Sequence, residues 1–156
     1  MGNLLPKILG WLTIIITLAL APSINTANVA VIAAITTNAS SFIGMSVITT
    51  FGAPLMILAL LFTGGMLAAG KVGDGSVRDM MGVIGAVIVT IVALTMFVSV
   101  ITYVRLLVNN STGFAVVIYG IIPIILYLGV IAGAGVITAV KSFSGKKSKK
   151  STKSYM

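Results

Sequence analysis

The sequence predicts an all-α integral membrane protein with four transmembrane helices. Only 8% of the residues are charged, whereas 58% are hydrophobic and the mean hydropathy is +1.20. A soluble domain carries about 25% charged residues, so this chain cannot cover a water-facing surface. Four apolar stretches approach the roughly 20 residues that a bilayer core requires. The placement of the basic residues then selects four spans rather than five.

The predicted spans cover residues 5–21, 51–70, 80–104 and 115–140. The last two exceed the minimum length, so they can tilt in the membrane. These spans make up a membrane helical domain of residues 1–140.

The first span also has features of a secretory signal peptide. A short charged start precedes an apolar run that ends in Ala-Leu-Ala at residues 19–21. Pro22 directly after this candidate cleavage site disfavours cleavage there. We therefore expect the stretch to be retained as the first helix.

The segment between the first two spans, residues 22–50, is apolar enough to suggest a fifth span. Asn25, Asn28 and Asn38 weaken that interpretation. We expect a partly helical external segment that lies on or extends the second span, with a possible extra helix within residues 27–50.

Charge placement supports four spans because lysine and arginine collect on the cytoplasmic side of short loops. With four spans, Lys7, Lys71, Arg78 and the lysines of residues 141–156 share one side, and only Arg105 lies on the other. Five spans would remove this bias. Both termini are therefore expected on the cytoplasmic or interior side. The sequons at Asn38, Asn109 and Asn110 would then face outward as possible glycosylation sites.

The loop at residues 71–79 contains both acidic residues of the chain, Asp74 and Asp79. Lys71 is expected to end the preceding helix, where a positive charge is favourable. Ser76 or Asp74 is expected to cap the next helix, with Asp79 in its first turn. The loop is thus predicted to be a tight helical hairpin.

Residues 48–94 combine a Gly-x-Pro entry, a glycine pair, a short basic loop and a small-residue helix start. The residues are Gly52-Ala53-Pro54, Gly64-Gly65, Lys71, Arg78, Gly82, Gly85 and Ala86. This run resembles the helical hairpin of conjugative type IV secretion pilins and their archaeal DNA-transfer relatives. The resemblance implies subunits that stack into a helical tube with lipids between them, and a basic loop that lines the lumen.

Small residues four positions apart are the next signal, because they let helix backbones approach in lipid. The pairs are Gly65 with Ala69, Gly82 with Ala86, and Gly129 with Gly133. They could pack the helices of one chain or join copies. We expect a homo-oligomer or a larger assembly.

The tail at residues 141–156 contains six of the ten basic residues: Lys141, Lys146, Lys147, Lys149, Lys150 and Lys153. Its Ser, Gly and Lys content cannot form a core. Together with Lys71 and Arg78, these lysines are expected to contact anionic membrane lipids. Nucleic acid is the alternative partner, because the same charges neutralise phosphates.

Catalysis is not expected, since the chain has no His, no Cys and two acidic residues. We predict no enzyme activity, no cofactor and no metal site. Three hypotheses stay open: a structural, self-assembling subunit of a conjugation-type pilus or DNA-transfer apparatus, an envelope or capsid membrane protein of an archaeal-type virus, and a holin-like pore.

Overall fold

The computed structural model describes the chain except residues 1–3, 38–41, 43, 72–75 and 145–156, and for residues 135–144 it describes only the backbone. The described residues form four helices: α1 (Leu4–Thr36), α2 (Met45–Ala68), α3 (Val77–Asn109) and α4 (Phe114–Ser144). Each contains a stretch long and apolar enough to cross a membrane. The prediction of an all-α membrane protein with four spans is confirmed.

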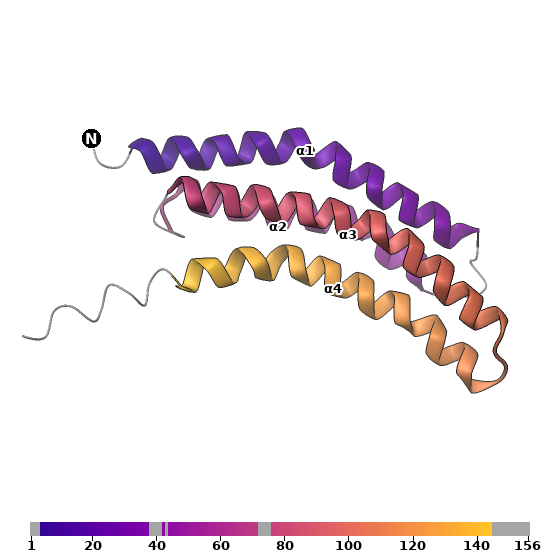
Figure 1. Ribbon diagram of the computed structural model, residues 1–156. Coiled ribbons are helices and arrows are strands. Elements are labelled where there is room, and N and C mark those ends of the chain that lie inside the picture. The colour runs from indigo at the N-terminus through magenta and orange to yellow at the C-terminus, as the bar shows by residue number, and fades with distance from the viewer. Residues whose placement is uncertain (1–3, 38–41, 43, 72–75, 145–156) are drawn as a thin grey trace, which may run out of the picture.

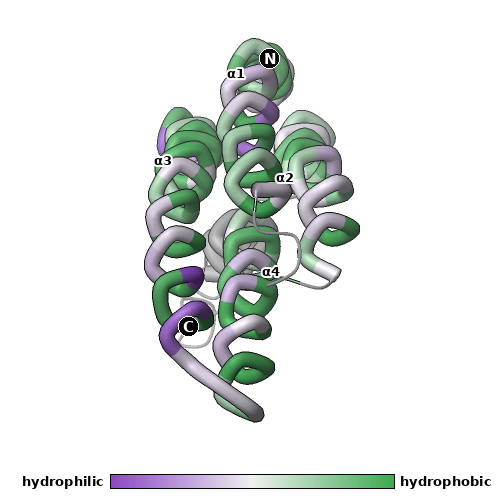
Figure 2. The backbone as a smooth tube through the Cα atoms, turned by 90° about the vertical axis from the view of Figure 1, so that its right-hand side faces the viewer, coloured by the Kyte–Doolittle hydropathy of each residue, from purple (hydrophilic) through white to green (hydrophobic). Residues whose placement is uncertain are grey.

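The helices run up and down and form a bundle that is diamond-shaped in cross-section. The start of α1, the end of α2, the start of α3 and the end of α4 lie together at one end, here called the N-terminal end (Figure 1). The opposite ends of the helices form the far end. Viewed along the bundle, α1 and α4 lie at opposite corners with α2 and α3 between them (Figure 2). The backbones of α1 and α4 do not contact each other, and each packs against both α2 and α3.

Helix α1 continues past the end of the predicted first span. It passes through Pro22 and ends only at Thr36, and residues 45–50 belong to α2. Among the described residues of 27–50, residues 27–36 continue α1 and residues 45–50 extend the second span, so the possible extra helix is not a separate element. The external location of this segment stays a prediction. Proline removes one backbone donor but does not end a helix whose second half is stabilised by packing. At 33 residues, α1 is about 50 Å long.

The packing that extends α1 is visible on one face of its second half. Ile24, Asn28, Val31 and Ile35 are all buried, at spacings of four, three and four residues. Asn28 therefore lies on the inner face, although its polarity weakened the sequence-based assignment of a helix here. Close packing against α2 and α3 offsets what the proline costs.

The turn from α2 to α3 is well capped at both sides. Gly70 has φ 67°, and its N–H donates to Leu67 O at 3.0 Å. The Lys71 N–H donates to Met66 O at 3.0 Å, which completes a Schellman motif just beyond the end of α2. On the other side, Ser76 is the N-cap of α3 and forms a capping box with Asp79. The predicted cap at Ser76 is confirmed, whereas Asp74 lies outside the described residues.

The buried positions of α3 alternate in steps of four and three residues along its whole length. They include Val83, Val87, Thr90, Leu94, Phe97, Ile101, Val104 and Val108. This repeat of 3.5 residues is typical of coiled-coil packing. Outside this core, large apolar side chains are exposed on all four helices, as expected of a lipid-facing surface. Hydrophobic residues, in green, recur along all four helices in Figure 2.

Candidate functional site

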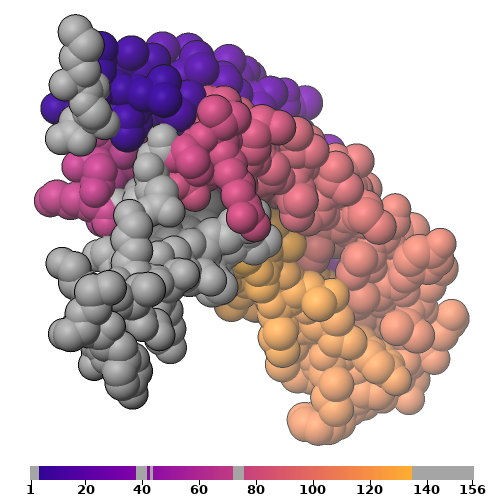
Figure 3. Space-filling model, turned by 60° about the vertical axis from the view of Figure 1, so that its left-hand side comes forward, coloured from indigo at the N-terminus to yellow at the C-terminus, as the bar shows by residue number. Residues whose placement is uncertain are grey.

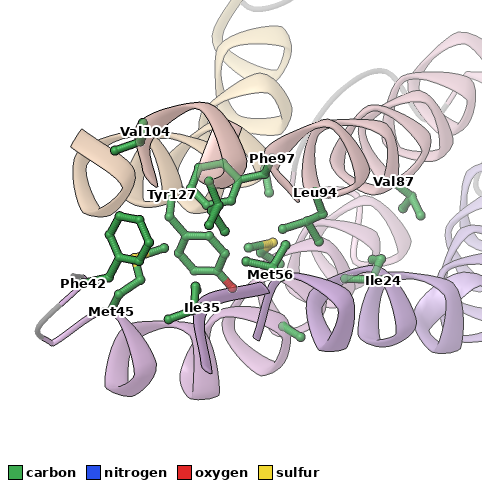
Figure 4. Close-up of a cluster of buried hydrophobic side chains, with 14 of the residues drawn as sticks. Ile24, Ile35, Phe42, Met45, Met56, Val87, Leu94, Phe97, Val104 and Tyr127 are labelled. Carbon is green, nitrogen blue, oxygen red and sulfur yellow. The ribbon is translucent and has the colours of Figure 1, made fainter. Parts of the chain in front are cut away.

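The centre of the buried cluster is Tyr127, which is fully buried although it comes from α4. Figure 4 shows its ring in the middle of the cluster, with Phe97 and Met56 beside it. The Phe97 and Tyr127 ring centroids are 5.5 Å apart at an interplanar angle of 64°, an edge-to-face contact. Tyr127 thus brings α4 into contact with the interior of the other three helices.

The hydroxyl group of Tyr127 is hydrogen-bonded to the diagonally opposite helix. It donates to Asn28 Oδ1 of α1, and Asn28 Nδ2 donates to the Thr49 carbonyl oxygen of α2 at 2.9 Å. Asn28 is 2% exposed. Burying its amide without partners would cost a few kcal/mol, so these bonds keep it tolerable at membrane depth. They link α1, α2 and α4 at one point.

A glycine makes room for this tyrosine. A Cβ atom added to Gly52 of α2 would overlap the Tyr127 hydroxyl and ring. No other residue fits here without displacing Tyr127. We call the set Asn28, Thr49, Gly52, Phe97 and Tyr127 the polar hub. It lies nearer the far end, because Thr49 is in the first turns of α2.

A different contact joins α1 and α2 at the N-terminal end. A Cβ atom on Gly10 would overlap both the backbone and the side chain of Ala68. A Cβ atom on Gly64 would lie 3.1 Å from Ile14 Cγ1. We call these four residues the glycine contact. The two backbones approach closely there because glycine has no side chain.

Three glycines of the predicted packing pairs lie outside the glycine contact between α1 and α2. A Cβ atom on Gly65, Gly129 or Gly133 would meet nothing within 4 Å. Between α1 and α2, the structure uses Gly64 and Ala68, which have the same spacing as Gly65 and Ala69 but are shifted by one residue. Ala69 is exposed. The three open glycines do not mediate close packing with the described residues of this chain.

The remaining predicted pair lies on α3. Ala86 is buried and Gly82 is half-buried. These two residues face the bundle at least in part, whereas Gly129 is exposed. Their burial agrees with packing inside the chain.

The described basic residues occupy the two ends of the bundle. Lys7, Lys71 and Arg78 are exposed at the N-terminal end, and Arg105 is exposed one turn before the end of α3. Lys141 lies in α4 near the N-terminal end of the bundle. Five predicted contacts, namely Lys146, Lys147, Lys149, Lys150 and Lys153, fall outside the described residues.

The predicted sequons can be placed only in part. Asn109 is the last residue of α3 and Asn110 is its C-cap; both are exposed at the far end. Asn38 lies outside the described residues. The glycosylation of these residues stays a prediction.

An open groove of about 440 Å³ lies between α1 and α3. Its lining residues are Pro22, Ser23, Thr26, Ala27, Ala30, Ile91 and Thr95. The hydroxyl groups of Thr26 and Thr95 donate to carbonyl oxygens of their own helices, Pro22 O and Ile91 O, both at 2.9 Å. Two of the three hydroxyl groups in the lining are thus bonded within their own helices, and the third is that of Ser23.

Sequence reasoning missed the polar hub. Its signal was the spacing of Asn28 with Ile24, Val31 and Ile35, which places the amide on a repeating face of a helix.

Among the described residues, no group of three or more His, Cys, Asp or Glu side chains could hold a metal ion. Comparisons with protein-family models, curated proteins and solved structures found no match to this chain.

Proposed function

We propose that this chain is a structural, self-assembling membrane subunit. The observation that supports the proposal is the outward face of α4. Gly129 is exposed, Gly133 is half-buried, and a Cβ atom on either would meet nothing within 4 Å. Their close-approach surface is therefore not used by the residues that the structure describes.

The physical argument rests on how helices associate in lipid. Lipid tails are as apolar as leucine, so helices associate through close packing and hydrogen bonds rather than through the hydrophobic effect. A glycine pair that faces lipid gives up side-chain contacts unless another helix approaches it. In our proposal, another copy of the same chain supplies the helix that packs against Gly129 and Gly133.

A pair of substitutions tests this proposal. Gly129→Leu with Gly133→Leu should leave the bundle folded, because both positions are open, and should shift the purified protein to smaller species. Native mass spectrometry in lipid nanodiscs measures the shift. Leu128→Phe is the matched control, since Leu128 is 48% exposed on a different face of α4. Unchanged assembly of the double variant would refute the role of this face.

The form of the assembly distinguishes the three hypotheses from sequence. Ordered filaments in electron micrographs would support the pilus or DNA-transfer subunit that residues 48–94 resemble. Co-purifying particles would support the viral envelope or capsid protein. Discrete rings with conductance in planar bilayers would support the holin-like pore.

We also infer that the N-terminal end of the bundle faces the cytoplasm or the particle interior. Lys7, Lys71 and Arg78 support this orientation, since basic residues collect on that side. The chain has no cysteine, so Ser148→Cys introduces a unique thiol. A membrane-impermeant maleimide should leave it unlabelled in intact cells and label it after lysis. Labelling in intact cells would show that this end of the bundle faces the outside and would refute the inferred orientation.

A further inference from the structure

The N-terminal end brings three cations to one level of the bundle. Gly10 of α1 contacts Ala68 of α2, and the two helices run in opposite directions. Lys7 lies three residues before Gly10, and Lys71 lies three residues after Ala68, so the two lysines are at a similar height. Arg78 is in the first turn of α3 at the same end. Figure 3 faces this end, with the start of α1 in indigo near the start of α3 in pink.

The two acidic residues of the chain, Asp74 and Asp79, offset part of this charge, so these five residues sum to +1. Asp79 is the one acidic residue among the described residues of this end, and its carboxylate accepts a hydrogen bond from the Ser76 N–H at 3.3 Å. That carboxylate is therefore oriented toward the helix terminus. Lys7, Lys71 and Arg78 are all exposed, and the surface that they form is here called the basic end.

The apolar neighbours of the basic end place it at the membrane surface rather than in open water. Lys7 lies between the exposed side chains of Leu4, at 65%, and Trp11, at 63%. On α3, the neighbours Val77 and Met81 of Arg78 are also exposed. Cations on long apolar stems within a ring of exposed apolar residues reach the headgroup layer while their stems stay in the acyl region.

We propose that the basic end binds the phosphate groups of anionic phospholipids. Charge complementarity carries the choice of partner: three exposed cations meet a layer of phosphates at the depth that their apolar neighbours impose. A nucleic acid would have to lie against Leu4, Trp11, Val77 and Met81, which offer it no phosphate contact. The proposal goes beyond self-assembly and does not depend on it.

Trp11 provides a natural reporter for this surface. It is the only tryptophan of the chain and is 63% exposed. It follows Lys7 by four residues, so both lie on one face of α1, about 6 Å apart along the helix. A lipid held at Lys7 therefore places the upper part of its acyl chains beside the indole.

The experiment compares two quenching lipids in vesicles that contain the full-length protein. Phosphatidylglycerol or phosphatidylcholine, brominated high on the acyl chain, is added at the same mole fraction to a phosphatidylcholine background. We expect brominated phosphatidylglycerol to quench Trp11 more strongly at low mole fraction, with a relative association constant above one. Lys7→Gln should lower that constant about fivefold, the effect of roughly 1 kcal/mol for one cation near an anionic surface. Equal quenching by the two lipids in the wild-type protein would overturn the proposal.

Two further variants separate the basic end from other cations. Arg105 lies near the end of α3, at the far end of the bundle. Arg105→Gln should therefore leave the quenching of Trp11 unchanged. Replacing the six lysines of residues 141–156 by glutamine should preserve most of the preference for phosphatidylglycerol. Loss of the preference in the tail variant, with no effect of Lys7→Gln or Arg78→Gln, would overturn the proposal and assign lipid binding to the tail.

Competition tests the nucleic-acid alternative. A single-stranded oligonucleotide is added to protein in nanodiscs that contain brominated phosphatidylglycerol. We expect no recovery of Trp11 fluorescence at the ionic strength of the quenching assay. A recovery that Lys7→Gln abolishes would show that nucleic acid occupies the basic end and would overturn the lipid assignment.

Discussion

The two ends of this bundle hold their helices together in opposite ways. At the N-terminal end, α1 and α2 meet through Gly10 and Ala68, whose backbones approach so closely that no extra atom fits. Toward the far end, Tyr127 crosses the bundle and hydrogen-bonds to Asn28. The first contact brings backbones together, and the second bridges two helices whose backbones do not touch.

This difference shows how a chain with few polar groups can specify one arrangement in lipid. Any two helices that present small residues can pack closely. Close packing alone therefore sets the distance between two helices but does not determine which helices pair. A hydrogen bond between Tyr127 and Asn28 needs both residues at matching heights and therefore selects one register. The polar hub also places α4, the helix with the smallest buried share of its span.

The largest expected effect comes from breaking the glycine contact. Gly10→Leu places a side chain into the backbone of Ala68, which cannot move aside without separating α1 from α2. We expect a loss of about 3 kcal/mol or complete misfolding, since overpacking against backbone is at the upper end of such costs. Reversible unfolding in mixed micelles measures it. Gly65→Leu, on an open face, is the matched control and should change stability by less than about 1 kcal/mol.

A smaller loss is expected when a methyl group enters the polar hub. Gly52→Ala overlaps the end of the Tyr127 side chain rather than a backbone, so the ring can shift, but the shift breaks its hydrogen bond to Asn28. We expect about 2 kcal/mol from the combined strain and lost bond. The same unfolding assay applies. If Gly52→Ala is as stable as the wild-type protein, Gly52 does not seat Tyr127.

The four spans were predictable because length and hydropathy suffice to identify a membrane helix. The cap at Ser76 was predictable because its signal is local in sequence. The continuation of α1 beyond Pro22 was not, since it depends on packing against α2 and α3. In a water-soluble protein, burial at Ile24 and Val31 would have shown as hydrophobic periodicity.

That periodicity is missing because the outer surface faces lipid. Exposed Ile15 and Leu58 are as apolar as buried Ile35 and Leu60, so hydropathy does not distinguish the inner face from the outer one. The same ambiguity explains the shift from Gly65 to Gly64, which are adjacent and equally small. Polar residues remain informative, because a buried amide such as Asn28 needs partners.

A double-mutant cycle measures how strongly the hub couples α1 to α4. Asn28→Leu and Tyr127→Phe each remove one side of the bond, and each leaves the other polar group with fewer partners. We expect about 1–2 kcal/mol for each substitution and a coupling energy of roughly 1 kcal/mol, within the range of interhelical hydrogen bonds in membranes. Additive effects in the unfolding assay would show that the bond does not join the two helices.

The smallest expected effect comes from removing a hydroxyl group on the outer surface of the bundle. Thr95→Val removes one hydroxyl group, as Tyr127→Phe does, but Thr95 is exposed and donates only to Ile91 O of its own helix. That carbonyl oxygen also accepts the bond of the regular helix, so no polar group is stranded. We expect a change within about 0.5 kcal/mol by unfolding. A loss equal to that of Tyr127→Phe would mean that stability does not depend on which helices a hydroxyl connects, and the contrast between hub and surface would fail.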